Sequence, residues 1–210
     1  MASLDLLISA GADPTSLFND HVDDAAVIAV GHSAGGGTVL AAAADPRIDG
    51  YVSLASGVLR AGDTSTSVAP TDLPDRPSFF MAGTVDEVVP AETVTRPAFE
   101  AAPSPSLLWV ITGVGHNGFD DFCTFGNGTG IIGIAEAAGL GALLDTQPAL
   151  RRLGEDGCVP PALAATDTFP MIRHAVTAWI RHALRVDEQR IGIGPDVADA
   201  FVTPVEIVEK

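Results

Sequence analysis

The sequence predicts an α/β protein in which a mostly parallel sheet is flanked by helices. Four apolar runs of strand length, at 26–30, 50–54, 77–82 and 106–112, are interleaved with helical and loop segments. Alternation of strand and helix with short connections favours parallel strands joined by right-handed crossovers. The chain has 210 residues, of which 47% are hydrophobic. This length and composition fit one domain with a sizeable core and a sheet buried on both faces.

Charge and hydropathy exclude several classes of partner. The formal net charge is −16, and the only lysine of the sequence is Lys210. A phosphate-binding surface needs clustered lysine and arginine, so nucleic acid and anionic membranes are poor partners. Every apolar run falls well short of the ~18 residues that read as a membrane-spanning helix. We therefore expect no membrane span.

The most informative motif is Gly31-His32-Ser33-Ala34-Gly35, a G-x-S-x-G pattern. It follows the first apolar run directly and precedes a helical segment at 38–44. In this context the motif predicts a tight strand-to-helix turn that lifts the serine hydroxyl out of the backbone. We expect side chains at positions 31 and 35 to collide with the neighbouring strand and helix. The alternative is a glycine-rich turn of some other α/β protein.

Two further polar residues follow later strands in an informative order. Asp86 lies in the loop after the run at 77–82, and His116 lies in the loop after the run at 106–112. A serine hydroxyl becomes a good nucleophile only when a base takes its proton and a third group orients that base. Glu87 is the alternative acid. Taken singly, Asp86 could be a turn residue and His116 a loop histidine without chemistry.

These segments resemble the α/β-hydrolase superfamily, and most of all the serine esterases of its dienelactone-hydrolase, chlorophyllase and cutinase-like branches. The segments GHSAGG, AGTVDEVVP and GVGHNGF are similar to those of the family, and the resemblance covers roughly residues 20–120 and the last long helix. It implies Ser33 as nucleophile, His116 as general base and acid, and Asp86 as orienting acid. It also implies that the N–H of Ala34 contributes to an oxyanion hole.

The resemblance further implies strands ahead of the serine turn and a second oxyanion donor from an early loop. Only a short apolar helix at 4–10 and a loop precede the first strand here. We therefore expect the chain to be the C-terminal portion of a longer hydrolase. A minimal variant, or one completed by another polypeptide, is the alternative.

The remaining segments fit a single domain with an insertion. The predicted core covers 20–116 and 167–187, and the predicted insertion, a lid or a structural excursion packed outside the sheet, covers 117–166. Helices are expected at 90–101 and, with a buried stripe that includes Trp179, at 168–186. The insertion carries helical segments at 131–144 and 148–153. A loop at 61–75 and a tail at 192–210 remain without assigned structure.

The two cysteines, Cys123 and Cys158, bracket the insertion and match no metal-binding spacing. We expect a disulfide between them, which would indicate a secreted or extracytoplasmic protein. Two free thiols in a cytoplasmic protein are the alternative. The match of 128–133 to G-x-G-x-x-G lacks the strand and acidic residue of a dinucleotide site. Asp120 and Asp121 fit a helix cap or solvated loop better than a metal site, so no cofactor and no metal are expected.

The sequence therefore predicts a serine hydrolase that acts on small-molecule or lipid-like carboxylic esters. Two alternatives stay open, namely a non-catalytic module on a hydrolase fold, and a peptidase or amidase on the same scaffold. The acyl and alcohol groups of the substrate and the oligomeric state have no sequence signal.

Overall fold

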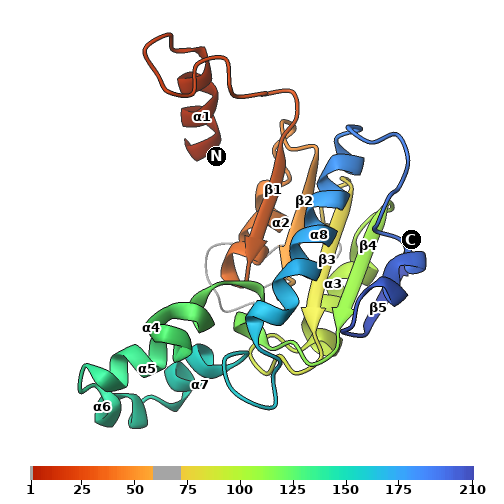
Figure 1. Ribbon diagram of the computed structural model, residues 1–210. Coiled ribbons are helices and arrows are strands. Elements are labelled where there is room, and N and C mark those ends of the chain that lie inside the picture. Colours follow the sequence, from red (N-terminus) through yellow and green to blue (C-terminus); the bar gives the residue numbers. More distant parts are fainter. Residues whose placement is uncertain (1, 59–71) are drawn as a thin grey trace.

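The computed structural model describes residues 2–58 and 72–210 and has a five-stranded, mostly parallel sheet at its centre (Figure 1). The strands follow one another across the sheet in chain order. The first four pair in parallel and the fifth is antiparallel to the fourth. The predicted α/β class is thus confirmed. The strands are β1 (Ile28–His32), β2 (Gly50–Leu54), β3 (Ser78–Gly83), β4 (Ser106–Ile111) and β5 (Val205–Glu209).

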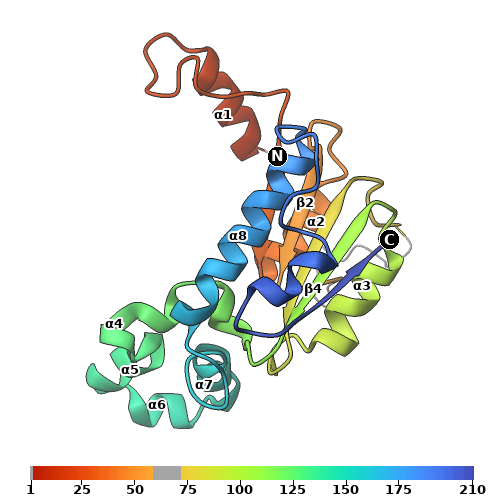
Figure 2. The ribbon, with the colours of Figure 1, turned by 45° about the vertical axis from the view of Figure 1, so that its right-hand side comes forward.

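Helices cover both faces of the sheet. On one face, α8 (Ala165–Ala183) packs its buried Met171, Ile172 and Trp179 against alternate side chains of β2, β3 and β4. The intervening side chains of these strands form a second cluster with α2 (Ala34–Ala42) and α3 (Arg96–Ala101). Figures 1 and 2 show α8 on one side of the sheet and α3 on the other. Burial on both faces explains why β2, β3 and β4 are apolar and wholly buried.

The β1 edge of the sheet is less covered than its centre. β1 pairs only with β2 within the described residues, and Val30 is 45% exposed. The helix expected at 4–10 is present as α1 (Ala2–Ala12), which has no buried residue and stands apart from the sheet (Figure 1). No strand precedes Ile28 in the part of the chain that the structure describes.

The insertion forms a group of short helices beyond the carboxyl ends of the parallel strands (Figures 1 and 2). It projects from that end and does not pack on the outside of the sheet. The segment expected to be helical at 131–144 is divided in two, because Gly139 adopts a φ of +83° between the two helices. From His116 onward, the insertion and the residue before it form η3 (His116–Phe119), η4 (Phe122–Thr124), α4 (Phe125–Gly128), α5 (Gly130–Ala137), α6 (Gly141–Asp145) and α7 (Pro148–Glu155).

Three other expectations differ in detail from the structure. The helix after Ser33 begins at Ala34, four residues before the apolar segment that predicts it. The helix expected at 90–101 opens with a π-helical turn, η2 (Ala91–Thr95), before α3. The unassigned tail forms η5 (Pro195–Ala200) and β5, and Val205 and Ile207 pack against the α8 cluster. Most of the loop expected at 61–75 lies outside the described residues.

Candidate active site

Ser33 lies in a sharp turn between β1 and α2 and adopts a φ of 55° and a ψ of −123°. A non-glycine residue with positive φ is uncommon and marks a backbone held by its surroundings. The turn requires glycine at position 31, because a Cβ there would lie 2.2 Å from the carbonyl oxygen of Gly35.

The expectation for position 35 is wrong, since a Cβ on Gly35 would meet nothing within 4 Å. Position 35 lies on an exposed part of the first turn of α2. Gly36 has the close contact instead, because its Cβ would lie 2.5 Å from the Cβ of Ser56. The helix therefore approaches the end of β2 at position 36.

The Ser33 hydroxyl meets the imidazole of His116, which begins η3 just after β4. The distance from Ser33 Oγ to His116 Nε2 is 2.8 Å. The imidazole is almost completely buried, with 1% of the residue exposed. Ser33 itself is partly exposed, so the hydroxyl lies between a buried ring and the surface.

The other ring nitrogen of His116 meets the carboxylate of Asp86, which lies in the loop after β3. The distance from His116 Nδ1 to Asp86 Oδ2 is 3.0 Å, and the backbone N–H groups of Val88 and Val89 donate to Asp86 Oδ1. An ionised carboxylate accepts hydrogen bonds but donates none. In a neutral imidazole, Nδ1 is then the donor to Asp86, and Nε2 accepts a hydrogen bond from the Ser33 hydroxyl. Glu87, the alternative acid, is exposed, and its side chain makes no hydrogen bond to His116.

The loops that carry Asp86 and His116 are bonded to each other as well as through these side chains. The N–H of Val85 donates to the carbonyl of Val114, and the N–H of Gly113 donates to Thr84 Oγ1. A Cβ at Gly83 would lie 1.9 Å from the Val114 carbonyl oxygen. Glycine at position 83 thus permits the close approach that brings the two loops together.

His32, next to Ser33, supports the His116 loop from the other side. Its Nε2 lies 3.0 Å from the carbonyl oxygen of His116, and its Nδ1 lies 3.1 Å from Asp120 Oδ2. The other oxygen of Asp120 accepts the N–H of Phe122, two residues further along the chain. Of the two expectations for Asp120 and Asp121, a helix cap and a solvated loop, the cap is not formed, because η4 has Asp121 at its N-cap position without a side-chain capping bond. The carboxylate of Asp121 is exposed and makes no such contact within the described residues.

Asp156 joins both loops, although no sequence feature predicts this. It follows α7 and lies 40 residues after His116. Its Oδ1 accepts the backbone N–H of His116 at 2.7 Å, and its Oδ2 accepts the backbone N–H of Glu87 at 2.7 Å. The neighbouring Asp-Gly pair indicates a turn but does not indicate which segments the turn contacts.

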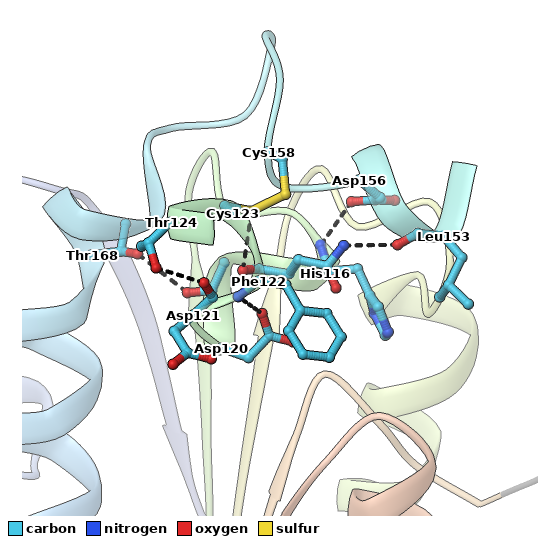
Figure 3. The surroundings of a disulfide bond; sticks show 12 residues. His116, Asp120, Asp121, Phe122, Cys123, Thr124, Leu153, Asp156, Cys158 and Thr168 are labelled. Carbon is cyan, nitrogen blue, oxygen red and sulfur yellow. Dashed lines mark hydrogen bonds between the residues drawn. A yellow bond between two sulfur atoms is a disulfide. The ribbon is translucent and has the colours of Figure 1, made fainter. Parts of the chain in front are cut away.

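A disulfide joins Cys123 to Cys158, as the sequence predicts, with the two Cα atoms 4.9 Å apart. Figure 3 shows it beside His116 and Asp156, and Cys158 lies only two residues after Asp156. Cys123 Sγ also lies 3.5 Å from the carbonyl oxygen of Asn117. The disulfide thus ties the end of the insertion to the loop that carries His116.

Ala34, the residue after Ser33, is the first residue of α2, so its N–H lies at the positive end of the helix dipole. This N–H has no hydrogen-bond acceptor within residues 2–58 and 72–210. It is therefore free to donate to a negatively charged oxygen beside Ser33.

A cavity of about 590 Å³ lies near the site, between the Asp86 loop and the end of the insertion. Val85, Arg151, Pro160 and the Asp156-Gly157 pair are among its lining residues, whereas Ser33 and His116 are not. Asp86 also lines the cavity, which therefore adjoins Asp86 and not Ser33.

Among the side chains that the structure describes, no group of three or more His, Cys, Asp or Glu is arranged to hold a metal ion. None of the helices in the described ranges combines the length and apolarity that crossing a bilayer requires.

Comparison with models of known protein families finds none that matches this chain. Comparison with curated proteins likewise finds no match.

Proposed function

We propose that this chain is a serine hydrolase of the α/β-hydrolase superfamily that cleaves carboxylic esters through an acyl-enzyme intermediate. One observation carries the proposal, namely the continuous chain of hydrogen bonds from the Ser33 hydroxyl through His116 to Asp86. Its three members come from the ends of three parallel strands, in the order typical of this superfamily. The positive φ of Ser33 supports the assignment of its turn as a nucleophile elbow.

In the first half of the proposed reaction, Ser33 Oγ attacks the ester carbonyl carbon while His116 Nε2 takes the hydroxyl proton. Asp86 holds the Nδ1–H tautomer and stabilises the imidazolium that forms. When the tetrahedral intermediate collapses, the bond from carbon to the alcohol oxygen breaks. His116 returns its proton to that oxygen, and the alcohol leaves.

In the second half, a water molecule gives a proton to His116 Nε2 and attacks the acyl carbon. The bond from carbon to Ser33 Oγ then breaks, and the proton passes back to Ser33. The free acid leaves and the starting state is restored. The N–H of Ala34 would donate to the carbonyl oxygen when it carries negative charge, at the end of a helix dipole that favours this charge.

Features around the site support an apolar ester as the substrate. The insertion beside His116 exposes large apolar side chains, among them Phe122, Phe125 and Leu143. The net charge of −16 disfavours anionic substrates through the overall field. An insertion that lies beyond the carboxyl ends of the strands would shape the approach to Ser33. The disulfide supports a secreted or extracytoplasmic location.

A fluorophosphonate probe tests the proposal directly. Such a probe forms a bond from phosphorus to an activated serine oxygen and releases fluoride, so it reports nucleophilicity without assuming a substrate. We expect labelling of the folded protein at one site, with the probe mass on the peptide that contains Ser33. A well-folded protein that stays unlabelled would instead indicate a non-catalytic module. Hydrolysis of an amide as fast as the matched ester would indicate a peptidase or amidase.

A further inference from the structure

Two hydrogen bonds place Asp156 between the loops that carry Asp86 and His116. One oxygen of its carboxylate accepts the N–H of His116 itself, and the other accepts the N–H of Glu87, the residue after Asp86. Both distances are 2.7 Å, within the short range of hydrogen bonds to an ionised acceptor. Asp156 is thus bonded to the backbone of both partners of the Asp86–His116 pair.

The backbone around Asp156 is shaped for this contact. Gly157 has a φ of +88°, and a Cβ on it would lie 2.8 Å from the backbone nitrogen of Asn117. On the opposite side, a Cβ on Gly115 would lie 2.6 Å from Asp156 Oδ1. Glycines on both sides therefore let the two segments approach more closely than side chains would allow.

Further bonds hold the segment in place. The carbonyl of Asp156 accepts the N–H of Asn117, and the Asn117 side-chain amide donates to the carbonyl of Leu153 at 2.7 Å. The disulfide joins Cys158, two residues after Asp156, to Cys123, seven residues after His116 (Figure 3). The segment that carries Asp156 is therefore joined to the residues that follow His116 by these bonds as well as through the carboxylate.

We propose that Asp156 is a positioning residue that sets the separation and orientation of Asp86 and His116. This inference rests on the proposed hydrolase function for its kinetic consequence but not for its geometry. Asp156 contacts no reacting atom. The two N–H groups that donate to Asp156 belong to loops that follow different strands. Because both loops share this one acceptor, Asp156 fixes the distance between them. A misplacement of about 1 Å at such a pair can cost about 100-fold in rate.

The substitution Asp156→Asn tests this role with little change in volume. An asparagine has one oxygen, so one of the two N–H groups must face an amide NH2 in place of an acceptor. We expect kcat on a soluble activated ester to fall about 10- to 100-fold, while KM changes less than about threefold. The matched control is Asp121→Asn, since Asp121 lies in the same insertion and its carboxylate is exposed. The control should retain wild-type kcat and KM.

A spectroscopic reading separates positioning from a general loss of stability. The proton on His116 Nδ1, hydrogen-bonded to Asp86, should give a low-field proton resonance that disappears in Asp86→Asn. We expect this resonance to shift or broaden in Asp156→Asn at temperatures where the variant is fully folded, and to be unchanged in Asp121→Asn. A folded Asp156→Asn variant with wild-type kcat and an unchanged resonance would overturn the inference.

A measurement on the wild-type protein covers the case in which Asp156→Asn does not fold. If the two bonds exist in solution, the backbone amides of Glu87 and His116 should both exchange with solvent at least about tenfold more slowly than unprotected amides. An unprotected Glu87 amide would rule out the shared acceptor. If the wild-type protein shows no turnover and no fluorophosphonate labelling, the proposed function fails. The resonance and the exchange rates still decide the role of Asp156.

Discussion

Ser33 Oγ and His116 Nε2 lie 2.8 Å apart, although 83 residues separate them along the chain. They meet because Ser33 follows β1 and His116 follows β4, and the carboxyl ends of parallel strands lie at one edge of a sheet. Between these strands, β3 brings Asp86 to the same edge. The parallel sheet therefore brings the three residues of the hydrogen-bonded chain to one edge.

The assignment of the acid can be tested by comparing two neighbouring residues. Because the Asp86 carboxylate fixes the tautomer of His116, we expect Asp86→Asn to lower kcat by about 10⁴. The substitution Glu87→Gln keeps the backbone N–H and changes an exposed side chain, so kcat should stay within about threefold of wild type. Steady-state kinetics on one ester decide between them, and the reverse ranking would identify Glu87 as the acid.

The glycines of the serine turn give a prediction on stability. A Cβ on Gly31 would overlap the Gly35 carbonyl, so Gly31→Ala should lower the free energy of unfolding by about 3 kcal/mol. Gly35→Ala is the matched control, because its Cβ meets nothing within 4 Å and alanine favours a helix by up to about 1 kcal/mol over glycine. Urea denaturation measures both variants. A Gly35→Ala variant as unstable as Gly31→Ala would contradict this geometry.

The disulfide should stabilise the insertion and the contact beside His116. In the chain-entropy model, a crosslink over a sequence separation of 35 contributes about 4 kcal/mol. We therefore expect the double variant Cys123→Ser with Cys158→Ser to unfold at a lower denaturant concentration. The hydrogen-exchange rates of the backbone amides from 122 to 158 should rise more than those of the rest of the protein, because the crosslink closes this segment. If the double variant exchanged in this segment as slowly as the wild-type protein, the disulfide would not stabilise the insertion.

The burial of Tyr51 predicts that the free energy of unfolding falls at alkaline pH. Burial raises the pKa of Tyr51 to about 12, although the neighbouring Ser78 acts on this pKa in the opposite direction. In the unfolded chain the phenol ionises near pH 10, so above that pH the unfolded state loses a proton that the folded state keeps. The contribution of Tyr51 is complete below about pH 10, and up to about 1.4 kcal/mol per pH unit should be lost between about pH 10 and 12.

Tyr51 is the single tyrosine of the sequence, so tyrosinate absorbance follows this one group. The variant Tyr51→Phe keeps the packing and removes the ionisable hydroxyl. It should show a shallower loss of stability over the same pH range. Ionisation of Tyr51 near pH 10 in the folded protein would contradict the burial of its hydroxyl.

The sequence predicts those features whose signals are local. β2 coincides with the apolar run at 50–54, and the other parallel strands lie close to theirs, because a strand buried on both faces is mainly apolar. Ser33, Asp86 and His116 stand out because each lies just after such a run. Their proximity follows from the parallel sheet, whereas their roles in catalysis stay predictions.

Features set by tertiary contacts have no comparable signal. The helix α2 begins within a run of glycines, which have low helix propensity, because the turn at Ser33 and the contact of Gly36 with Ser56 fix the backbone there. The short β5 lies in a tail whose alternating Val205, Glu206 and Ile207 become informative only once β4 offers an edge. Asp156 is an ordinary loop aspartate in the sequence, since its two partners lie 40 and 69 residues away.

We infer that the Ser33 hydroxyl, activated by His116, forms an acyl-enzyme. Rapid mixing of the wild-type protein and of Ser33→Ala with an activated ester tests this inference, with Ser56→Ala as the control for loss of a nearby hydroxyl. We expect a burst of alcohol close to one equivalent per protein molecule in the wild type and in Ser56→Ala, and no burst and no turnover in Ser33→Ala. A Ser33→Ala variant that retained the burst and full turnover would contradict the inference.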